Sequence, residues 1–296
     1  MGTVSRLGAD RGILGAVCTS SFVPSTDGVQ VRVHDFGGDG PDLLLCHATG
    51  MHGMVWSPVI GQLTGSFRCV ALDFRGHGDS AVPVGSSLAW TGMADDVLAV
   101  VDGLGLVGAL RAAGWSMGGC ALALAGLERR GLWRAAWAME PIIFGADTVE
   151  ISGATRGNAL ADSARRRREV FATRDEAIAN YASKPPFDRA EPAALRAYVN
   201  HGFEDLDDGT VRLKCRGETE ARLFELSVTE TGSRLGELDF PFTVVASGDG
   251  FPPALVAPWV ASQLGAGTLE RMEDLSHFAP MEDPTRVAAS IRRAVA

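Results

Sequence analysis

The sequence predicts an α/β fold with a mostly parallel sheet flanked by helices, and three observations support it. In the N-terminal half, short apolar runs that end in Gly-rich turns alternate with segments of helical periodicity. The same alternation returns near the C-terminus, after a long charged and Ala-rich block. The 296 residues are 46% hydrophobic and 21% charged, a composition that supports a large buried core. Strands and helices that alternate in this way form parallel sheets covered on both faces.

The first half of the chain contains most of the predicted core elements. Period-2 alternation or continuous apolar runs predict strands within residues 29–36, 42–47, 67–74, 109–116 and 133–141. Apolar residues at helical spacing predict helices within residues 91–104 and 117–130. Near the C-terminus, residues 240–250 predict a strand, residues 257–273 a helix followed by a strand, and residues 283–296 a final helix.

The domain boundaries follow from where this alternation stops. Residues 144–238 are helical in period and are interrupted by breakers at Pro185, Pro186 and Pro192, so they predict a helical cap inserted into the core. The α/β core is then made of residues 22–143 and 239–296. Residues 1–21 are expected to be a frayed N-terminal extension, because their apolar run is too short for a signal peptide.

Charge and cysteine content narrow the class of partner. The formal net charge is −9, from 27 Lys and Arg against 36 Asp and Glu, which argues against nucleic acid or an anionic membrane as partner. No window of about 20 residues is apolar enough to span a bilayer. The five cysteines are odd in number and lack a C-x-x-C pair, which favours reduced thiols in a cytoplasmic protein over disulfides or a metal site.

A candidate nucleophile lies between a predicted strand and a predicted helix. The segment GWSMGG, Gly114–Gly119, matches G-x-S-x-G in that context, where the motif forms a sharp turn that presents Ser116. Gly114 and Gly118, two residues before and after the serine, leave space for strand and helix to approach closely. The N-terminus of the following helix would direct free N–H groups toward negative charge that develops on a substrate.

Three further motifs follow the order found in a known family. HATG at His47–Gly50 resembles an oxyanion loop, DFRGHGDS at Asp73–Ser80 resembles the loop after the fourth strand, and LSHFAPMEDP at Leu275–Pro284 resembles the loop that carries a catalytic histidine. Together with the serine turn, these motifs make the chain, from about Phe22 to the C-terminus, resemble an α/β-hydrolase. The resemblance implies the α/β-hydrolase fold with an inserted cap.

The resemblance also implies a catalytic triad. Serine needs a neighbouring base, and His277 has the late position that the chain order serine, acid, histidine requires. The acid departs from the commonest pattern, because the usual position after residues 242–248 is occupied by Phe251. Glu140, which ends an earlier strand, matches the placement in haloalkane-dehalogenase-like and lipase-like branches and is the expected acid, with Asp249 in reserve.

The remaining site residues come from the same resemblance. The backbone N–H groups of Thr49 and Met117 are expected to form the oxyanion hole. His47, Met51 and Trp115 are expected to line the substrate pocket, with Trp115 as a bulky apolar wall.

Other patterns are assigned structural roles. By resemblance, His47 and His77 occupy positions of structural histidines, and His52 has no assigned role. The run RRRR at residues 165–168 is expected to be a solvated helix face, since acidic residues follow it closely. The GxGxxG match at residues 103–108 is rejected as a dinucleotide site because a helix precedes it and a strand follows.

These features predict a serine hydrolase that cleaves an ester, thioester or lactone of a small, largely apolar substrate through an acyl-enzyme. No metal and no organic cofactor is expected. Two alternatives stay open: an α/β-hydrolase-fold lyase, cyclase or C–C bond hydrolase, and a small-molecule receptor. The intact serine turn weighs against the receptor. Nothing in the sequence predicts an oligomeric state.

Overall fold

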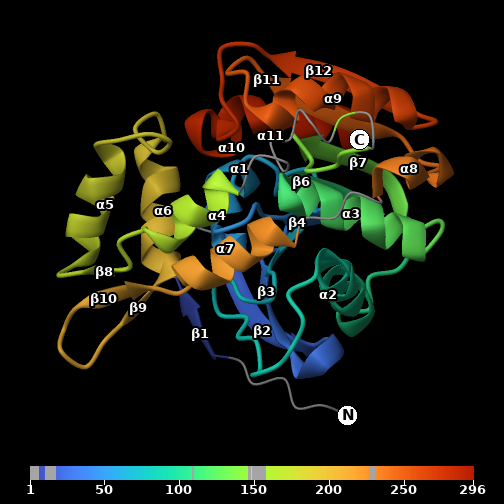
Figure 1. Ribbon diagram of the computed structural model, residues 1–296. Coiled ribbons are helices and arrows are strands. Elements are labelled where there is room, and N and C mark those ends of the chain that lie inside the picture. Colours follow the sequence, from blue (N-terminus) through green and yellow to red (C-terminus); the bar gives the residue numbers. More distant parts are fainter. Residues whose placement is uncertain (1–6, 11–17, 109, 146–147, 149–157, 227–230) are drawn as a thin grey trace.

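The computed structural model describes residues 7–10, 18–108, 110–145, 148, 158–226 and 231–296 (Figure 1). Among these residues, nine strands form one sheet in the order β1-β2-β3-β5-β4-β6-β7-β11-β12. Their bounds are Leu7–Asp10 for β1, Cys18–Pro24 for β2, Gln30–Asp35 for β3, Asp42–Cys46 for β4, Arg68–Asp73 for β5, Leu110–Trp115 for β6, Trp133–Met139 for β7, Phe242–Ser247 for β11 and Gly267–Met272 for β12. The predicted α/β fold class is confirmed.

The direction of the strands determines which loops meet. Strands β5, β4, β6, β7, β11 and β12 pair in parallel, and β1, β2 and β3 add an antiparallel edge next to β5. Parallel strands place their carboxyl ends at one edge of the sheet, which is where ligands bind in open α/β sheets. The loops after β4, β6, β7, β11 and β12 therefore lie along the same edge.

Helices cover both faces of this sheet. Alternate strand residues point to opposite faces, so Leu44 packs into one apolar cluster while Leu43 and Leu45 pack into another. The first cluster includes α2 (Trp90–Gly103), α3 (Met117–Glu128) and α9 (Pro252–Gln263); the second includes α1 (Ser57–Ile60) and α11 (Pro284–Val295). In the described part of the chain, no helix is both long and apolar enough to cross a membrane.

The N-terminal segment differs from the expected frayed extension. Residues 7–10 and 18–21 lie in β1 and β2, whereas residues 1–6 and 11–17 are outside the described residues. Strand β2 pairs antiparallel with β3, and Ser20 lies opposite His34, with Oγ 3.0 Å from the His34 Nδ1. The polar run Thr19–Ser21 lacks the apolar pattern of a strand. Backbone pairing to β3 compensates for this, which sequence periodicity does not reveal.

The insertion, defined here as residues 158–226, is not purely helical. Its helices are accompanied by a three-stranded sheet in the order β8-β10-β9. Its elements are α4 (Ala159–Arg165), β8 (Val170–Phe171), α5 (Arg174–Ala182), α6 (Pro192–Gly202), β9 (Phe203–Asp205), β10 (Val211–Leu213) and α7 (Gly217–Glu225). Residues 146–147, 149–157 and 227–230 of the predicted cap are outside the described residues.

The predicted C-terminal boundary of the cap also differs. Within residues 231–238, α8 (Thr231–Arg234) packs on α3, and a 3₁₀ turn at Leu235–Glu237 packs on α9. Leu235 is fully buried in the cluster that contains these core helices. These residues belong with the core, because their apolar side chains face it.

The insertion contacts loops at the carboxyl edge of the sheet. His52, in the loop after β4, donates from Nε2 to the Tyr198 carbonyl at 3.0 Å, and the Glu191 N–H donates to the Met281 carbonyl at 2.8 Å. Aromatic residues of the insertion continue the apolar cluster that contains α1 and α11. The insertion therefore lies against the edge where the candidate site residues meet (Figure 1).

One arginine of the RRRR run is not on a solvated face. Arg167 lies beyond the end of α4, and its side chain is only 19% exposed. It donates to the hydroxyls of Tyr198 at 2.6 Å and Tyr181 at 3.3 Å, and it pairs with Glu220. The expectation of a solvated helix face is wrong for Arg167, because the tyrosines and the carboxylate satisfy its donors inside the insertion.

Candidate active site

Ser116 lies on a strained turn between β6 and α3. Its φ of 56° and ψ of −116° are unusual for a residue other than glycine, and such strain costs on the order of 1–3 kcal/mol. A Cβ added at Gly118 would lie 2.3 Å from the Cys46 carbonyl oxygen, so only glycine allows α3 to pass this close to β4. The turn holds the serine at the carboxyl end of β6, as the motif predicts.

Glu140 and His277 form a buried pair beside this turn. The His277 Nδ1 lies 2.6 Å from the Glu140 Oε2, and the other carboxylate oxygen accepts the Ser247 N–H at 2.6 Å. Glu140 is fully buried and has a positive φ of 44° just after β7. Both carboxylate oxygens are thus used, and in a neutral ring the contact with the carboxylate favours the tautomer that carries its proton on Nδ1 and none on Nε2.

Asp249, the reserve acid, reaches His277 at a different atom. Its Oδ2 accepts the His277 backbone N–H at 3.0 Å, and its Oδ1 accepts the Ser247 hydroxyl and the Phe251 N–H. Partial burial alone would raise the pKa of Asp249, but the N–H groups of Phe251 and His277 outweigh it and hold the pKa below its usual value. Asp249 therefore supports the histidine loop, and Glu140 is the acid on the ring.

The Ser116 backbone is tied to the end of a neighbouring strand, whereas its hydroxyl has no hydrogen-bond partner among the residues that the structure describes. The Ser116 N–H donates to the Met139 carbonyl at 2.9 Å, which places the serine turn next to the end of β7. Within the described residues, Ser116 Oγ has no hydrogen-bond partner. Catalytic hydrogen bonds are often long before substrate binds, so this geometry is compatible with a base at His277.

At the expected oxyanion positions, two backbone N–H groups have no partner among the described residues. Met117 is the first residue of α3, so its N–H has no partner within the helix. Neither the Met117 N–H nor the Thr49 N–H has a partner in the part of the chain that the structure describes. Free N–H groups at a helix N-terminus and in a neighbouring loop are suited to binding an oxyanion.

Two of the three expected pocket residues are placed differently. His47 and Trp115 expose no surface to water, and Trp115 donates from Nε1 to the His277 carbonyl at 2.8 Å. Trp115 thus holds the backbone of His277 through its indole N–H and does not form an exposed wall of the substrate pocket. Met51 is buried but keeps 5% exposure. The sequence pattern gives the position of Trp115 beside the serine but not the direction of its side chain.

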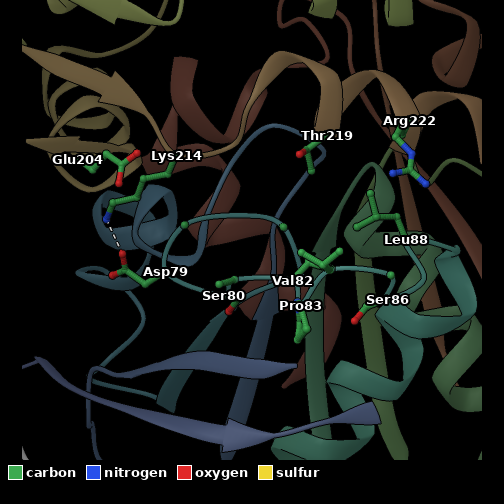
Figure 2. Close-up of a pocket in the computed structure, with 15 residues that line it drawn as sticks. Asp79, Ser80, Val82, Pro83, Ser86, Leu88, Glu204, Lys214, Thr219 and Arg222 are labelled. Carbon is green, nitrogen blue, oxygen red and sulfur yellow. Dashed lines mark hydrogen bonds and ion pairs between the residues drawn. The ribbon is translucent and has the colours of Figure 1, made fainter. Parts of the chain in front are cut away.

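A cleft between the core and the insertion does not include this cluster. It has a volume of about 590 Å³ between residues 76–88 of the core and the β9–α7 part of the insertion. Figure 2 shows Lys214 and Asp79 facing each other at one end, where Lys214 Nζ lies 2.6 Å from Asp79 Oδ1. None of the lining residues belongs to the Ser116, Glu140 and His277 cluster. The ion pair joins the insertion to the core.

Several histidines have roles that the sequence left open or only partly described. His52 stacks on the Tyr198 ring with centroids 6.0 Å apart, so it joins the core to the insertion. His34 lies 3.2 Å from Asp73, and this carboxylate raises the pKa of His34 to about 9 against the opposing effect of burial.

Among the described residues, no group of three or more His, Cys, Asp or Glu side chains could hold a metal ion.

Curated relatives match short stretches of the chain. A pimeloyl-[acyl-carrier protein] methyl ester esterase from Aeromonas salmonicida is 36% identical over 91 residues, which cover 31% of this chain and 34% of that protein. Protein phosphatase methylesterase 1 from Mus musculus is 32% identical over 154 residues, which cover 50% of this chain and 38% of that protein. The match thus spans about a third of the length of these curated relatives.

Solved structures and a family comparison cover much more of the chain. The crystal structure of E-2-(acetamidomethylene)succinate hydrolase has a TM-score of 0.80 at 19% identity and covers 94% of this chain and 99% of that chain. A thermophilic esterase from Thermogutta terrifontis has a TM-score of 0.68 at 21% identity, covering 93% and 97%. These likenesses show the same fold. The alpha/beta hydrolase family matches residues 43–290, and the chain belongs to this family.

Proposed function

We propose that this chain is a serine hydrolase of carboxylic esters, with Ser116 as nucleophile, His277 as base and Glu140 as the acid that orients the base. The observation that carries the proposal is the 2.6 Å contact between Glu140 Oε2 and His277 Nδ1, next to the strained turn of Ser116. A buried carboxylate on Nδ1 stabilises the imidazolium that forms when Nε2 takes a proton. The relatives that carry the name esterase support the same reaction class.

The reaction proceeds in two halves. The His277 Nε2 removes the proton from Ser116 Oγ, which attacks the ester carbonyl and forms a tetrahedral intermediate. His277 then gives this proton to the departing alcohol oxygen as the acyl–oxygen bond breaks. In the second half, His277 takes a proton from water, hydroxide adds to the acyl-enzyme, and the proton returns to Ser116 as the carboxylic acid leaves.

The free N–H groups of Thr49 and Met117 stabilise the oxyanion in both halves. The reacting groups are well enclosed, since Ser116, Thr49 and His277 are each 6–8% exposed. Enclosure strengthens these hydrogen bonds, because a low local dielectric increases electrostatic interactions. It also favours a compact substrate, such as a short-chain or methyl ester, and methyl esters appear in the names of the curated relatives.

The test compares hydrolysis of p-nitrophenyl acetate, butyrate and octanoate with that of methyl butyrate, for the wild type and Ser116→Ala. We expect turnover that falls with acyl length and disappears in the variant. Hydroxylamine added during turnover of methyl butyrate should yield butyrohydroxamate with the wild type and not with Ser116→Ala, because it captures the acyl-enzyme. Turnover without hydroxamate, or turnover retained by Ser116→Ala, would contradict the proposal and favour a reaction without an acyl-enzyme.

A further inference from the structure

The loop that carries the Thr49 donor is a tight turn with a defined geometry. The Met51 N–H donates to the Ala48 carbonyl at 3.1 Å, which closes a four-residue turn over residues 48–51. Gly50, the third residue of this turn, has a φ of +76°. A positive φ at the third position defines a type II turn, which differs from a type I turn by a flip of the central peptide. That peptide links Thr49 to Gly50.

His47 fixes the first peptide of the turn. Its Nδ1–H donates to the Ala48 carbonyl at 2.7 Å, while its Nε2 accepts the Phe74 N–H at 3.0 Å. The Ala48 carbonyl and the Thr49 N–H belong to one trans peptide, so they point in opposite directions. With the carbonyl held by His47 and the Met51 N–H, the Thr49 N–H must point away from both.

His77 fixes the central peptide. Its Nε2 accepts the Gly50 N–H at 3.0 Å, and its Nδ1–H donates to the Arg75 carbonyl at 3.1 Å. The bond to the Arg75 carbonyl places the ring proton on Nδ1. Nε2 can then accept the Gly50 N–H only if the ring is neutral. Burial lowers the pKa of His77 to about 4, and burial together with His77 keeps the pKa of His47 well below its usual value. Both rings are therefore neutral acceptors near pH 7.

We infer that His77 is a positioning residue for the oxyanion hole, which holds the Thr49–Gly50 peptide so that the neighbouring Thr49 N–H keeps its direction. This inference rests on the proposed function, since it concerns the same site. His77 exposes only 1% of its surface and lies on the loop after β5. The rings of His77 and His47 are 4.9 Å apart in an edge-on contact. Together they form hydrogen bonds with two consecutive peptides of the turn.

The test uses three variants, one substrate and one inhibitor that places an oxygen in the oxyanion hole. His77→Leu removes the acceptor, whereas His77→Gln restores one, because a glutamine side-chain oxygen reaches about as far as Nε2. His52→Leu is the matched control: His52 is buried to a similar degree as His77 and directly follows the turn in the loop after β4, but it donates to the Tyr198 carbonyl of the insertion and not to the turn. The readouts are kcat and KM for p-nitrophenyl butyrate and the Ki of phenylboronic acid, which forms a tetrahedral adduct on an active serine.

We expect His77→Leu to lower kcat by about 10–100-fold with KM nearly unchanged, a loss below that for complete removal of an oxyanion donor. The Ki of phenylboronic acid should rise by a similar factor. His77→Gln should recover most of both quantities, and His52→Leu should lower the melting temperature while leaving kcat within about threefold, as for a stability change alone.

Equal losses of kcat in His77→Leu and His52→Leu, or an unchanged Ki in His77→Leu, would overturn the inference. Titration of active serine with a fluorophosphonate normalises each rate to folded, competent enzyme, so partial misfolding of a variant does not imitate the effect. A wild type without any adduct would contradict the proposed function itself. A wild type with an adduct and a His77→Leu variant with normal kcat would contradict only the role of His77.

Discussion

Two carboxylates reach His277 from adjacent strand ends, and they contact it in different ways. Glu140, after β7, lies 2.6 Å from the ring Nδ1, whereas Asp249, after β11, accepts the backbone N–H at 3.0 Å. Only a carboxylate on the ring can choose the tautomer and stabilise the imidazolium. The comparison shows that distance from the histidine is a weak guide to an acid's role, and that the contacted atom decides it.

Glu140 and Asp249 also differ in their burial and in the groups that hydrogen-bond to them. Glu140 is completely buried and held by the Ser247 N–H, so its carboxylate has one fixed orientation. Asp249 is largely exposed, and it accepts hydrogen bonds from Ser247 and Phe251 of its own loop as well as from the His277 N–H. A buried acid that is fully bonded suits catalysis, because it needs no reorganisation as charge develops. An exposed acid in a turn is suited to shaping the loop.

The largest expected effect comes from Glu140→Gln. The amide keeps the shape of the side chain but can present N–H to Nδ1 and thus favours the wrong tautomer of His277. We expect kcat to fall by about 1,000- to 10,000-fold with KM little changed, as for loss of the acid in serine hydrolases. Steady-state kinetics with p-nitrophenyl butyrate checks this. A loss under tenfold would mean that the ring acid lies elsewhere.

An intermediate loss of kcat is expected for Trp115→Phe. This variant tests whether the hydrogen bond from the Trp115 indole to the His277 carbonyl helps to hold the histidine in place. The variant removes the donor to the His277 carbonyl at 2.8 Å and leaves this buried acceptor unpaired. We expect kcat to fall by about 3–10-fold, equivalent to about 1 kcal/mol for one hydrogen bond. The melting temperature should fall as well, since a fully buried ring is made smaller. Unchanged kcat and stability would show that Trp115 does not hold the histidine.

The smallest effect on rate is expected for Asp249→Asn. The amide oxygen can still accept one N–H, so kcat should stay within about threefold and the melting temperature should fall by about 2 °C. Because the native pKa of Asp249 is lowered, its contribution is present above the unfolded value near 3.8 and is lost as the pH falls through the native value. Thermal melts of wild type and variant should therefore differ at pH 5–7 and converge below about pH 4. A kcat loss as large as that of Glu140→Gln would reverse the assignment of the two acids.

Much of the core was predictable because its signals are local. The serine turn between an apolar strand and a helix, and the alternation of strands and helices, both follow from short-range sequence patterns. The position of Glu140 at a strand end was also readable. Its partner His277 lies 137 positions later in the chain. The pairing could therefore be expected only from the order of the motifs, and the contact distance comes from the structure.

The parts that sequence did not predict depend on neighbours distant in the chain. Strand β2 has a polar pattern and is held by backbone pairing with β3. Arg167 looked like part of a solvated run, but Tyr181, Tyr198 and Glu220 enclose it. The orientation of the Trp115 side chain is set by its hydrogen bond to the carbonyl of His277, 162 residues later in the chain. Each outcome reflects tertiary contacts that a local pattern does not encode.

The central claim, that Ser116 is an activated nucleophile, is tested most directly by intact mass after treatment with a fluorophosphonate. Wild type, Ser116→Ala and Glu140→Gln are treated side by side at neutral pH. The account predicts one adduct on the wild type, none on Ser116→Ala, and much slower labelling of Glu140→Gln, because the base is no longer oriented. Folded wild-type protein that gains no adduct, or a Ser116→Ala variant that gains one, would contradict it.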